Sequence, residues 1–186
     1  MGKFHRLTGV CLVVLLALAL SHSANAAISA SATYTSQQLG PNSYEYSVTL
    51  KNTGTTPIGT LWLGWVPFYD LLPSAPTAIT SPSGWTGINA PDLFGTASVQ
   101  WVNTTTPLAA GQTLSGFKFD TPDSPAAIGG TSFFAGFPVM ESYVYIAGPQ
   151  TDAGFALAAT VQTPEPSCLG LLLAAPSFLL MRRRRH

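Results

Sequence analysis

The middle of this 186-residue chain lacks both cysteine and histidine. The two cysteines and three histidines of the chain all lie in its end segments, as Cys11, Cys168, His5, His22 and His186. A disulfide, a zinc site with Cys or His ligands, and catalysis by a thiolate or an imidazole are therefore excluded for residues 27–163. We expect no cofactor in this region.

Charged residues are also scarce, at 9% of the chain, and their placement is uneven. Residues 27–163 contain Lys51 and Lys118 against seven acidic residues, which gives this region a net charge of −5. Nucleic-acid binding needs a basic stripe that neutralises phosphates, so we predict no nucleic-acid partner. The other six basic residues lie near the termini: Lys3, Arg6, Arg182, Arg183, Arg184 and Arg185.

Residues 1–26 have the pattern of a secretory signal peptide. Two basic residues precede an apolar run, Cys11 to Leu20, and an A-x-A cleavage site follows at Ala24 and Ala26, with Ala27 as the mature start. The alternative is an N-terminal membrane anchor, but the run is well short of the roughly 20 residues that a spanning helix needs. The expected partners are the general secretion machinery and signal peptidase.

Residues 27–163 have the pattern of short strands separated by turns. In NSYEYSVTLKN the apolar side chains of Tyr44, Tyr46, Val48 and Leu50 alternate with polar ones, which indicates a half-buried strand. Similar segments are ISASATYTS, TLWLGWV, ASVQWVN, TLSGFKF, TSFFAGF, SYVYIAG and GFALAATVQ. They predict one all-β domain, an antiparallel β-sandwich of the Ig/fibronectin type with about eight strands. Two proline-rich stretches, residues 67–91 and 121–130, are predicted to be long surface loops.

Carboxylates are the candidate catalytic groups, because the middle contains neither histidine nor cysteine. Asp120 and Asp123 are close together in FDTPDSP, which would suit a glycosidase-like hydrolase or a structural calcium ion. The interpretation we favour is structural: Asp120 ends a strand, and Asp123 is a turn residue that caps local amides. We predict no enzyme activity and no catalytic residue.

Aromatic side chains are the candidate ligand contacts. The residues considered are Trp62, Trp65, Trp85, Trp101, Phe68 and Tyr69. Alternation along a strand would place Trp62 and Trp65 on opposite faces, so at least one of them is expected in the core. Trp85 stands in the polar stretch SPSGWTG, and it is therefore the residue we select as a tentative carbohydrate contact.

Residues 164–186 combine three features in a fixed order. Pro164, Glu165 and Pro166 precede an apolar run from Ser167 to Met181, and Arg182 to Arg185 follow. As a helix, 15 residues would span roughly 22 Å, against roughly 30 Å of hydrocarbon. Four arginines resist translocation, so this segment predicts a short transmembrane helix that keeps the arginines inside. The alternative is an ordinary single-pass anchor.

These three parts together resemble the PEP-CTERM sorting signal of Gram-negative bacteria. The resemblance implies recognition by an exosortase-type membrane protease, transient anchoring in the inner membrane, and release to the cell surface or the exopolysaccharide matrix. Pro164, Glu165 and Pro166 would then be the sorting motif, and Arg182, Arg183, Arg184 and Arg185 the stop-transfer cluster. The segment TPLAAGQTLSGFKFD also resembles part of the Ig-like sandwiches that occur with this signal.

The sequence thus predicts an exported, non-enzymatic surface or matrix protein. It would consist of a signal peptide (1–26), a β-sandwich ectodomain (27–163) and a sorting signal (164–186). The alternative function is a carbohydrate-binding module for exopolysaccharide, and a carboxylate-dependent hydrolase is the third.

Overall fold

The computed structural model of the protein describes residues 27–91, 95–133, 136–148 and 150–162. Regular structure within these ranges is almost all β, so the predicted all-β class is confirmed. The elements are β1 (Ala30–Gly40), β2 (Ser43–Asn52), β3 (Thr60–Leu63), β4 (Trp65–Val66), β5 (Tyr69–Asp70), β6 (Thr77–Thr80), β7 (Thr86–Pro91), β8 (Ala97–Val102), β9 (Thr113–Thr121), α2 (Pro125–Ile128), β10 (Glu141–Tyr145) and β11 (Phe155–Gln162).

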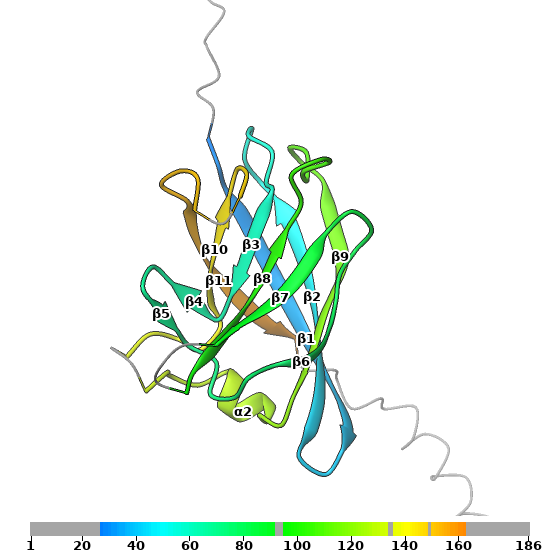
Figure 1. The fold of residues 1–186 in the computed structure, drawn as a ribbon, viewed down its shortest axis with the longest axis vertical. Helices are drawn as coiled ribbons and strands as arrows, with labels where there is room; N and C mark the ends of the chain where they lie inside the picture. The colour runs from blue at the N-terminus through cyan, green and yellow to red at the C-terminus, as the bar shows by residue number, and fades with distance from the viewer. Residues whose placement is uncertain (1–26, 92–94, 134–135, 149, 163–186) are drawn as a thin grey trace, which may run out of the picture.

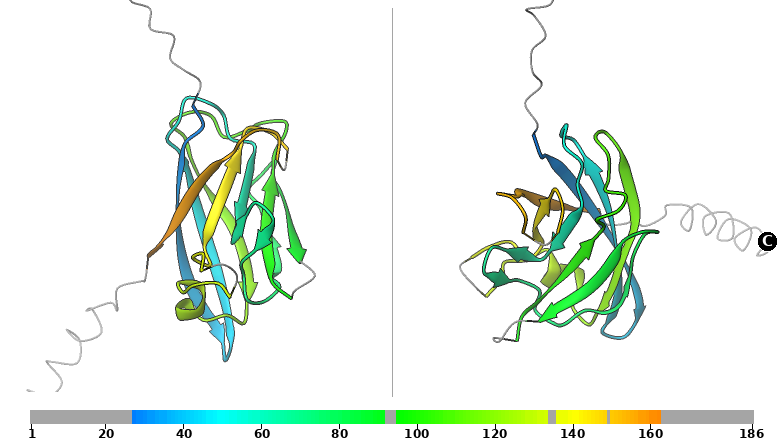
Figure 2. Two further views of the ribbon diagram at one scale, coloured as in Figure 1. Left: turned by 90° about the vertical axis from the view of Figure 1, so that its left-hand side faces the viewer. Right: turned by 45° about the horizontal axis from the view of Figure 1, so that its top comes forward.

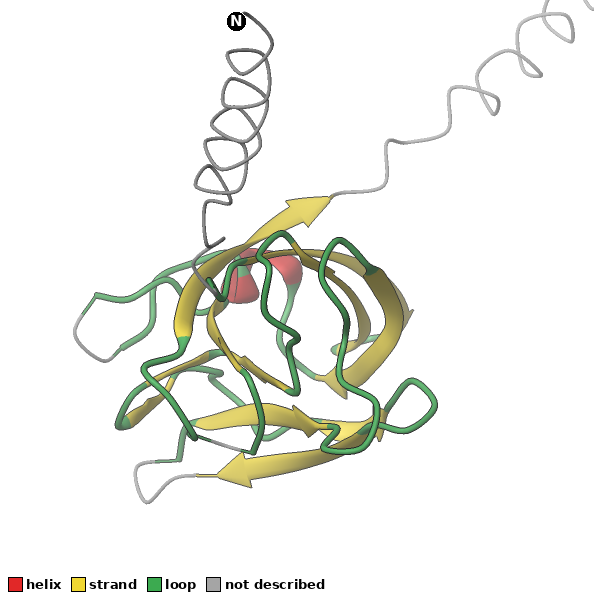
Figure 3. Cartoon of the chain, turned by 90° about the horizontal axis from the view of Figure 1, so that it is seen from above, coloured by secondary structure: helices red, strands yellow, loops and turns green. Residues whose placement is uncertain are grey.

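The long strands form two facing layers (Figures 1 and 2). Hydrogen bonding runs in the order β6-β9-β2-β1-β11-β10-β3-β8-β7, and the sheet folds over so that β6-β9-β2-β1 faces β10-β3-β8-β7. Figure 3, seen from above, shows this arrangement along the strand direction. The two short strands β4 and β5 form a separate hairpin.

Strand β11 belongs to both layers. Its first half pairs antiparallel with β10, through Phe155 to Ala158, and its second half pairs parallel with β1, through Ala159 to Gln162. The expectation of a purely antiparallel sandwich is therefore wrong for this pair. Because β11 crosses from one layer to the other, it closes one side of the sandwich.

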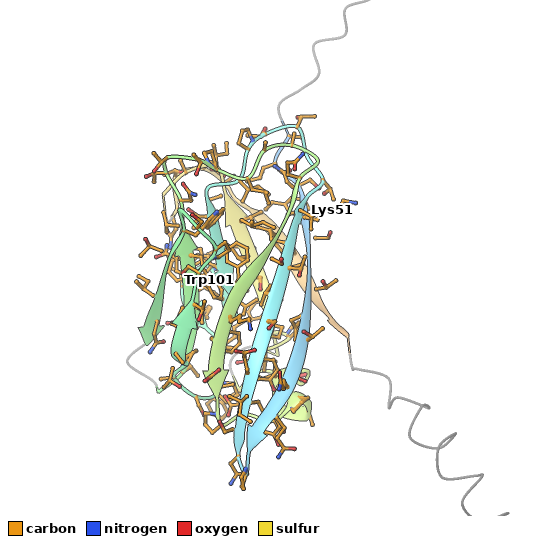
Figure 4. The ribbon with its side chains drawn as sticks, turned by 90° about the vertical axis from the view of Figure 1, so that its right-hand side faces the viewer. Lys51 and Trp101 are labelled. Atoms are coloured by element: carbon orange, nitrogen blue, oxygen red, sulfur yellow. The ribbon has the colours of Figure 1, made fainter. Side chains whose placement is uncertain are left out.

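The core lies between the layers, where strict alternation brings the apolar side chains inward. In β2 the inward residues Tyr46, Val48 and Leu50 are buried, as their period of two predicts. The side chain of Trp101 on β8 lies between the two layers, whereas Lys51 points outward from β2 (Figure 4). The indole of Trp101 also donates a hydrogen bond of 3.0 Å to the carbonyl of Thr80 in the opposite layer.

Two parts of the sequence prediction are wrong in the connections. The stretch 67–91, predicted to be a loop, contains β5, β6 and β7, because pairing with neighbouring strands organises sequence that has weak propensity of its own. The segment TSFFAGF is predicted to be a strand, but its described residues form no named strand and contribute an isolated bridge from Thr131 to Pro138. The stretch 121–130 contains the four-residue helix α2, whose amide at Ala127 is capped by the Ser124 hydroxyl.

Several predicted features lie outside the described residues. These are the signal peptide with Ala24 and Ala26, the sorting motif Pro164, Glu165 and Pro166, the C-terminal helix, and the cluster Arg182 to Arg185. Within the described part of the chain, no helix has the length and apolar character needed to cross a membrane.

Candidate functional site

A kink at Gly64 sends the chain out of β3 and into a projecting hairpin. Gly64 has a φ of 62°, and its carbonyl accepts a 2.8 Å hydrogen bond from the amide of Leu71, which closes the base. Between them, Trp65 pairs with Asp70 and Val66 pairs with Tyr69. We call the segment from Trp65 to Asp70 the aromatic hairpin. It stands beside the β10-β3 part of the sheet (Figure 1).

The kink places Trp65 directly on Trp62. Their ring centroids are 4.5 Å apart and the ring planes differ by 20°, which is a stacked arrangement. The expectation that these two tryptophans occupy opposite faces is therefore wrong. Alternation predicts side-chain direction only along a continuous strand, and the positive φ of Gly64 interrupts β3 before Trp65.

Two tyrosines of β10 complete this aromatic cluster, which consists of Trp62, Trp65, Tyr143 and Tyr145. Tyr143 meets the Trp65 ring at 5.7 Å and 89°, and Tyr145 meets it at 6.3 Å and 64°. The cluster forms a second apolar core, separate from the one between the sheets. Burial, followed by the nearby Tyr143 and Asp152, raises the pKa of Tyr145 above its usual value, so its phenol stays neutral. The cluster fixes the base of the hairpin.

The tip of the hairpin, by contrast, exposes its aromatic side chains to solvent. Phe68 is 93% exposed and Tyr69 is 43% exposed. Phe68 also has a φ of 81°, in the left-handed region that is uncommon for a residue with a bulky side chain. An exposed ring on strained backbone is unfavourable for stability alone, and such positions cluster at functional sites.

A row of cross-strand neighbours leads from the aromatic cluster across the same outer face to the edge strand β7. Strand register places Tyr143 opposite Trp62, Trp62 opposite Gln100, and Gln100 opposite the exposed Ile88. Gln100 is only 5% exposed, and its Nε2 has no hydrogen-bond partner among the described residues. The row therefore combines apolar surface with one buried amide donor.

Trp85, selected from the sequence as the ligand contact, lies in the core. It is 7% exposed, and its ring meets Phe117 at 5.1 Å in a T-shaped contact. The amide of Trp85 donates a 3.0 Å hydrogen bond to Pro82, so the polar residues before it form a turn that directs the indole inward. This placement gives no support to the predicted contact. The polar residues before Trp85 indicate a turn, but they do not indicate the direction of the Trp85 side chain, so the prediction from them was wrong.

The two aspartates of FDTPDSP are separated by their positions in the fold. Asp120 lies in β9, in register with Glu45 of β2, one residue before the strand ends. Asp123 bridges two segments: its carboxylate accepts bonds from the amide (3.0 Å) and hydroxyl (2.9 Å) of Ser74 and from the hydroxyl of Thr121 (3.0 Å). Asp123 therefore has a structural role, but the expectation that it caps local amides is wrong, because the amide bound to its carboxylate belongs to Ser74.

In the described part of the chain, no group of three or more His, Cys, Asp or Glu side chains lies close enough to hold a metal ion.

The loop that contains Asp123 has a further contact. The hydroxyl of Tyr46 donates a hydrogen bond of 2.8 Å to the backbone carbonyl of Asp123. Asp123 is therefore held by donors from Ser74, Thr121 and Tyr46.

Comparison with known proteins gives no family model and no curated protein that matches the chain. Among solved structures, the chain is similar to a GH20 exo-β-N-acetylglucosaminidase from Vibrio harveyi (TM-score 0.45, 11% identity, 74% of this chain and 19% of that one). It is also similar to the CBM3 of Hungateiclostridium clariflavum (TM-score 0.40, 10% identity, 66% and 94%). A third is the chitin-binding domain of Chi18aC from Streptomyces coelicolor (TM-score 0.36, 26% identity, 53% and 86%).

Replacing Asp123 should affect stability, whereas replacing Asp120 should not. Asp123→Asn removes a charged acceptor from three donors, so we expect the free energy of unfolding to fall by about 1–3 kcal/mol. The matched change Asp120→Asn should stay within about 0.5 kcal/mol of the unmodified protein. Urea unfolding followed by tryptophan fluorescence measures both. Equal losses for the two variants would contradict the structural role given to Asp123.

Proposed function

We propose that the protein is an exported, non-enzymatic component of the cell surface or extracellular matrix, and that its sandwich binds polysaccharide through the aromatic hairpin. The observation that carries the binding role is Phe68, an exposed aromatic ring on left-handed backbone. The stacked rings of Trp62 and Trp65 at the base of the hairpin give this exposed ring a packed support.

The chemistry of the hairpin tip suits a sugar ring. One face of a pyranose carries C–H groups, which pack on an aromatic ring through dispersion and weak electrostatic attraction. Phe68 and Tyr69 are neighbours at the tip, and Tyr69 adds a hydroxyl that can exchange hydrogen bonds with a sugar. Because the hairpin base is already packed, little conformational entropy should be lost when a ligand binds.

The charge of the domain favours a neutral polysaccharide. Residues 27–163 carry two lysines against seven acidic residues, so an anionic polymer would be repelled. One of the two lysines, Lys118, is also paired with Glu45 at 2.9 Å. We therefore name uncharged glycans as the ligand class.

Export and sorting are proposed from the two end segments of the sequence. The signal-peptide pattern ending at Ala26 supports export by the secretion machinery and signal peptidase. The order of Pro164-Glu165-Pro166, apolar run and Arg182 to Arg185 supports processing by an exosortase-type protease after transient residence in the inner membrane. A surface or matrix location would bring the hairpin into contact with exopolysaccharide.

Removing the exposed ring should weaken glycan binding without unfolding the protein. Burial of a phenyl ring contributes about 1.5–3 kcal/mol, so Phe68→Ala should weaken affinity for a bound neutral polysaccharide roughly tenfold or more. Retardation in native gels that contain β-glucan, galactomannan or glycol chitin measures the affinity. Leu39→Ala, an exposed apolar residue on β1, is the matched control and should change nothing.

Two results would overturn the binding proposal. One is that the unmodified protein migrates identically in every gel, with and without polysaccharide. The other is that Leu39→Ala weakens retardation as much as Phe68→Ala does. Trp85→Ala is unsuitable for this test, because deleting a buried tryptophan costs about 3–5 kcal/mol of stability and would reduce binding indirectly.

The mass of the mature protein tests sorting. Protein recovered from the surface or matrix of its native host should begin at Ala27 and should lack Arg182 to Arg185, as intact-mass spectrometry would show. A mature surface protein that still ends at His186 would contradict the sorting proposal and would favour the ordinary membrane anchor.

A further inference from the structure

The outer face of the β1-β2 ribbon contains a hollow that the binding proposal does not use. Its volume is about 570 Å³, within the range of ligand sites. Its lining consists of hydroxyl, amide and carboxylate side chains: Thr35, Ser36, Gln37, Glu45 and Ser47. It lies in the layer opposite the aromatic hairpin, so it is a separate surface.

The hollow lies on the outer face, beside the edge of β1 that pairs with β11. Thr35 and Gln37 face outward together with Ser47 and Glu45, their partners on β2, and Ser36 between them also lines the hollow. On that edge β1 pairs with β11 only as far as Thr35, and among the described strands none continues the pairing beyond it. The backbone of β1 after Thr35 is thus open on this side.

The register shows which part of the chain meets this edge. Gln162, the last residue of β11, is the partner of Thr35, and the two strands are parallel. A chain that continues beyond Gln162 in the same direction passes first Ser36 and then Gln37. The next residues in the sequence are Thr163, Pro164, Glu165 and Pro166. Proline has no amide hydrogen, so the two prolines cannot extend the ladder and β11 has to end here.

We propose that the segment from Thr163 to Pro166 docks in this hollow and is held by side chains instead of ladder hydrogen bonds. The proline carbonyls are acceptors for the hydroxyl of Ser47 and for the side-chain amide of Gln37. The ion pair between Lys118 and Glu45 offsets the negative charge that Glu165 would otherwise meet. A proline-rich segment is already extended, so docking costs it little conformational entropy.

Docking would control how often the segment from Thr163 to Pro166 is accessible to a protease. A protease needs several residues of extended chain in its own cleft, and a segment seated on β1 is available only when it leaves the hollow. The sandwich would thus limit the rate at which its own C-terminal motif is processed. Docking itself does not depend on the sorting role, since it concerns contacts within one chain.

Disulfide trapping in the full chain tests the docking. The background carries Cys11→Ser and Cys168→Ser, and Glu165→Cys is combined with either Gln37→Cys or Thr33→Cys. Gln37 and Thr33 are each two residues from Thr35, on the same face of β1 and in opposite directions. A docked segment should crosslink to position 37 roughly tenfold or more faster than to position 33, because docking raises the effective concentration there.

A variant in which a larger side chain fills the hollow distinguishes docking from the effect of chain direction alone. Ser47→Leu, placed in the Gln37→Cys and Glu165→Cys protein, fills the hollow from β2 and leaves both cysteines in place. Docking predicts that the rate then falls to that of the position 33 pair. Equal rates for positions 37 and 33, or a preference that survives Ser47→Leu, would overturn the docking. Neither result would affect the mass-spectrometric test of sorting.

Discussion

The contact between Trp101 and Phe117 is the interaction on which the rest of the structure depends. The two rings come from opposite layers and meet at 5.4 Å and 69°. Trp85 packs on the other side of this contact through Phe117, and the Trp101 indole reaches across to Thr80. Since the cysteines of the chain lie only in the end segments, apolar packing joins the two layers together with the backbone pairing of β11. Truncating Trp101 would cost about 3–5 kcal/mol, a large part of an ordinary domain's stability.

The core between the layers makes the second, smaller core possible, which is the aromatic cluster on the outer face of β3 and β10. With the inner faces of β3 and β10 fixed by Leu61 and Val144, their outer faces are free to carry aromatic residues. Trp62 and Tyr143 occupy those outer positions, and the kink at Gly64 folds Trp65 over them. The exposed ring of Phe68 is therefore connected to a rigid base through only a few residues. That is the arrangement which a preformed binding surface needs.

Sequence predicted the strands wherever alternation was continuous and failed where the backbone changed direction. The pattern in β2 put Tyr44, Tyr46, Val48 and Leu50 on one inward face. The last three are buried, and Tyr44 is partly buried against the core. The stacked tryptophans could not be predicted, because alternation does not show where the backbone takes a positive φ, as it does at Gly64. Trp85 was assigned to the surface from its polar neighbours, although the turn at Pro82 buries it. Exposure of Phe68 likewise became visible only once the hairpin was placed.

Binding at the aromatic hairpin is the central claim, and mapping the ligand on the protein tests it most directly. The measurement is a two-dimensional NMR titration of the isotope-labelled protein with a neutral oligosaccharide cut from the polysaccharide that it binds. Binding at the hairpin predicts that the amide shifts concentrate at Phe68 and Tyr69 and extend toward Ile88 along the row that contains Gln100. Shifts concentrated at Thr35 and Ser47 in the opposite layer, or no shifts at saturating ligand, would contradict it.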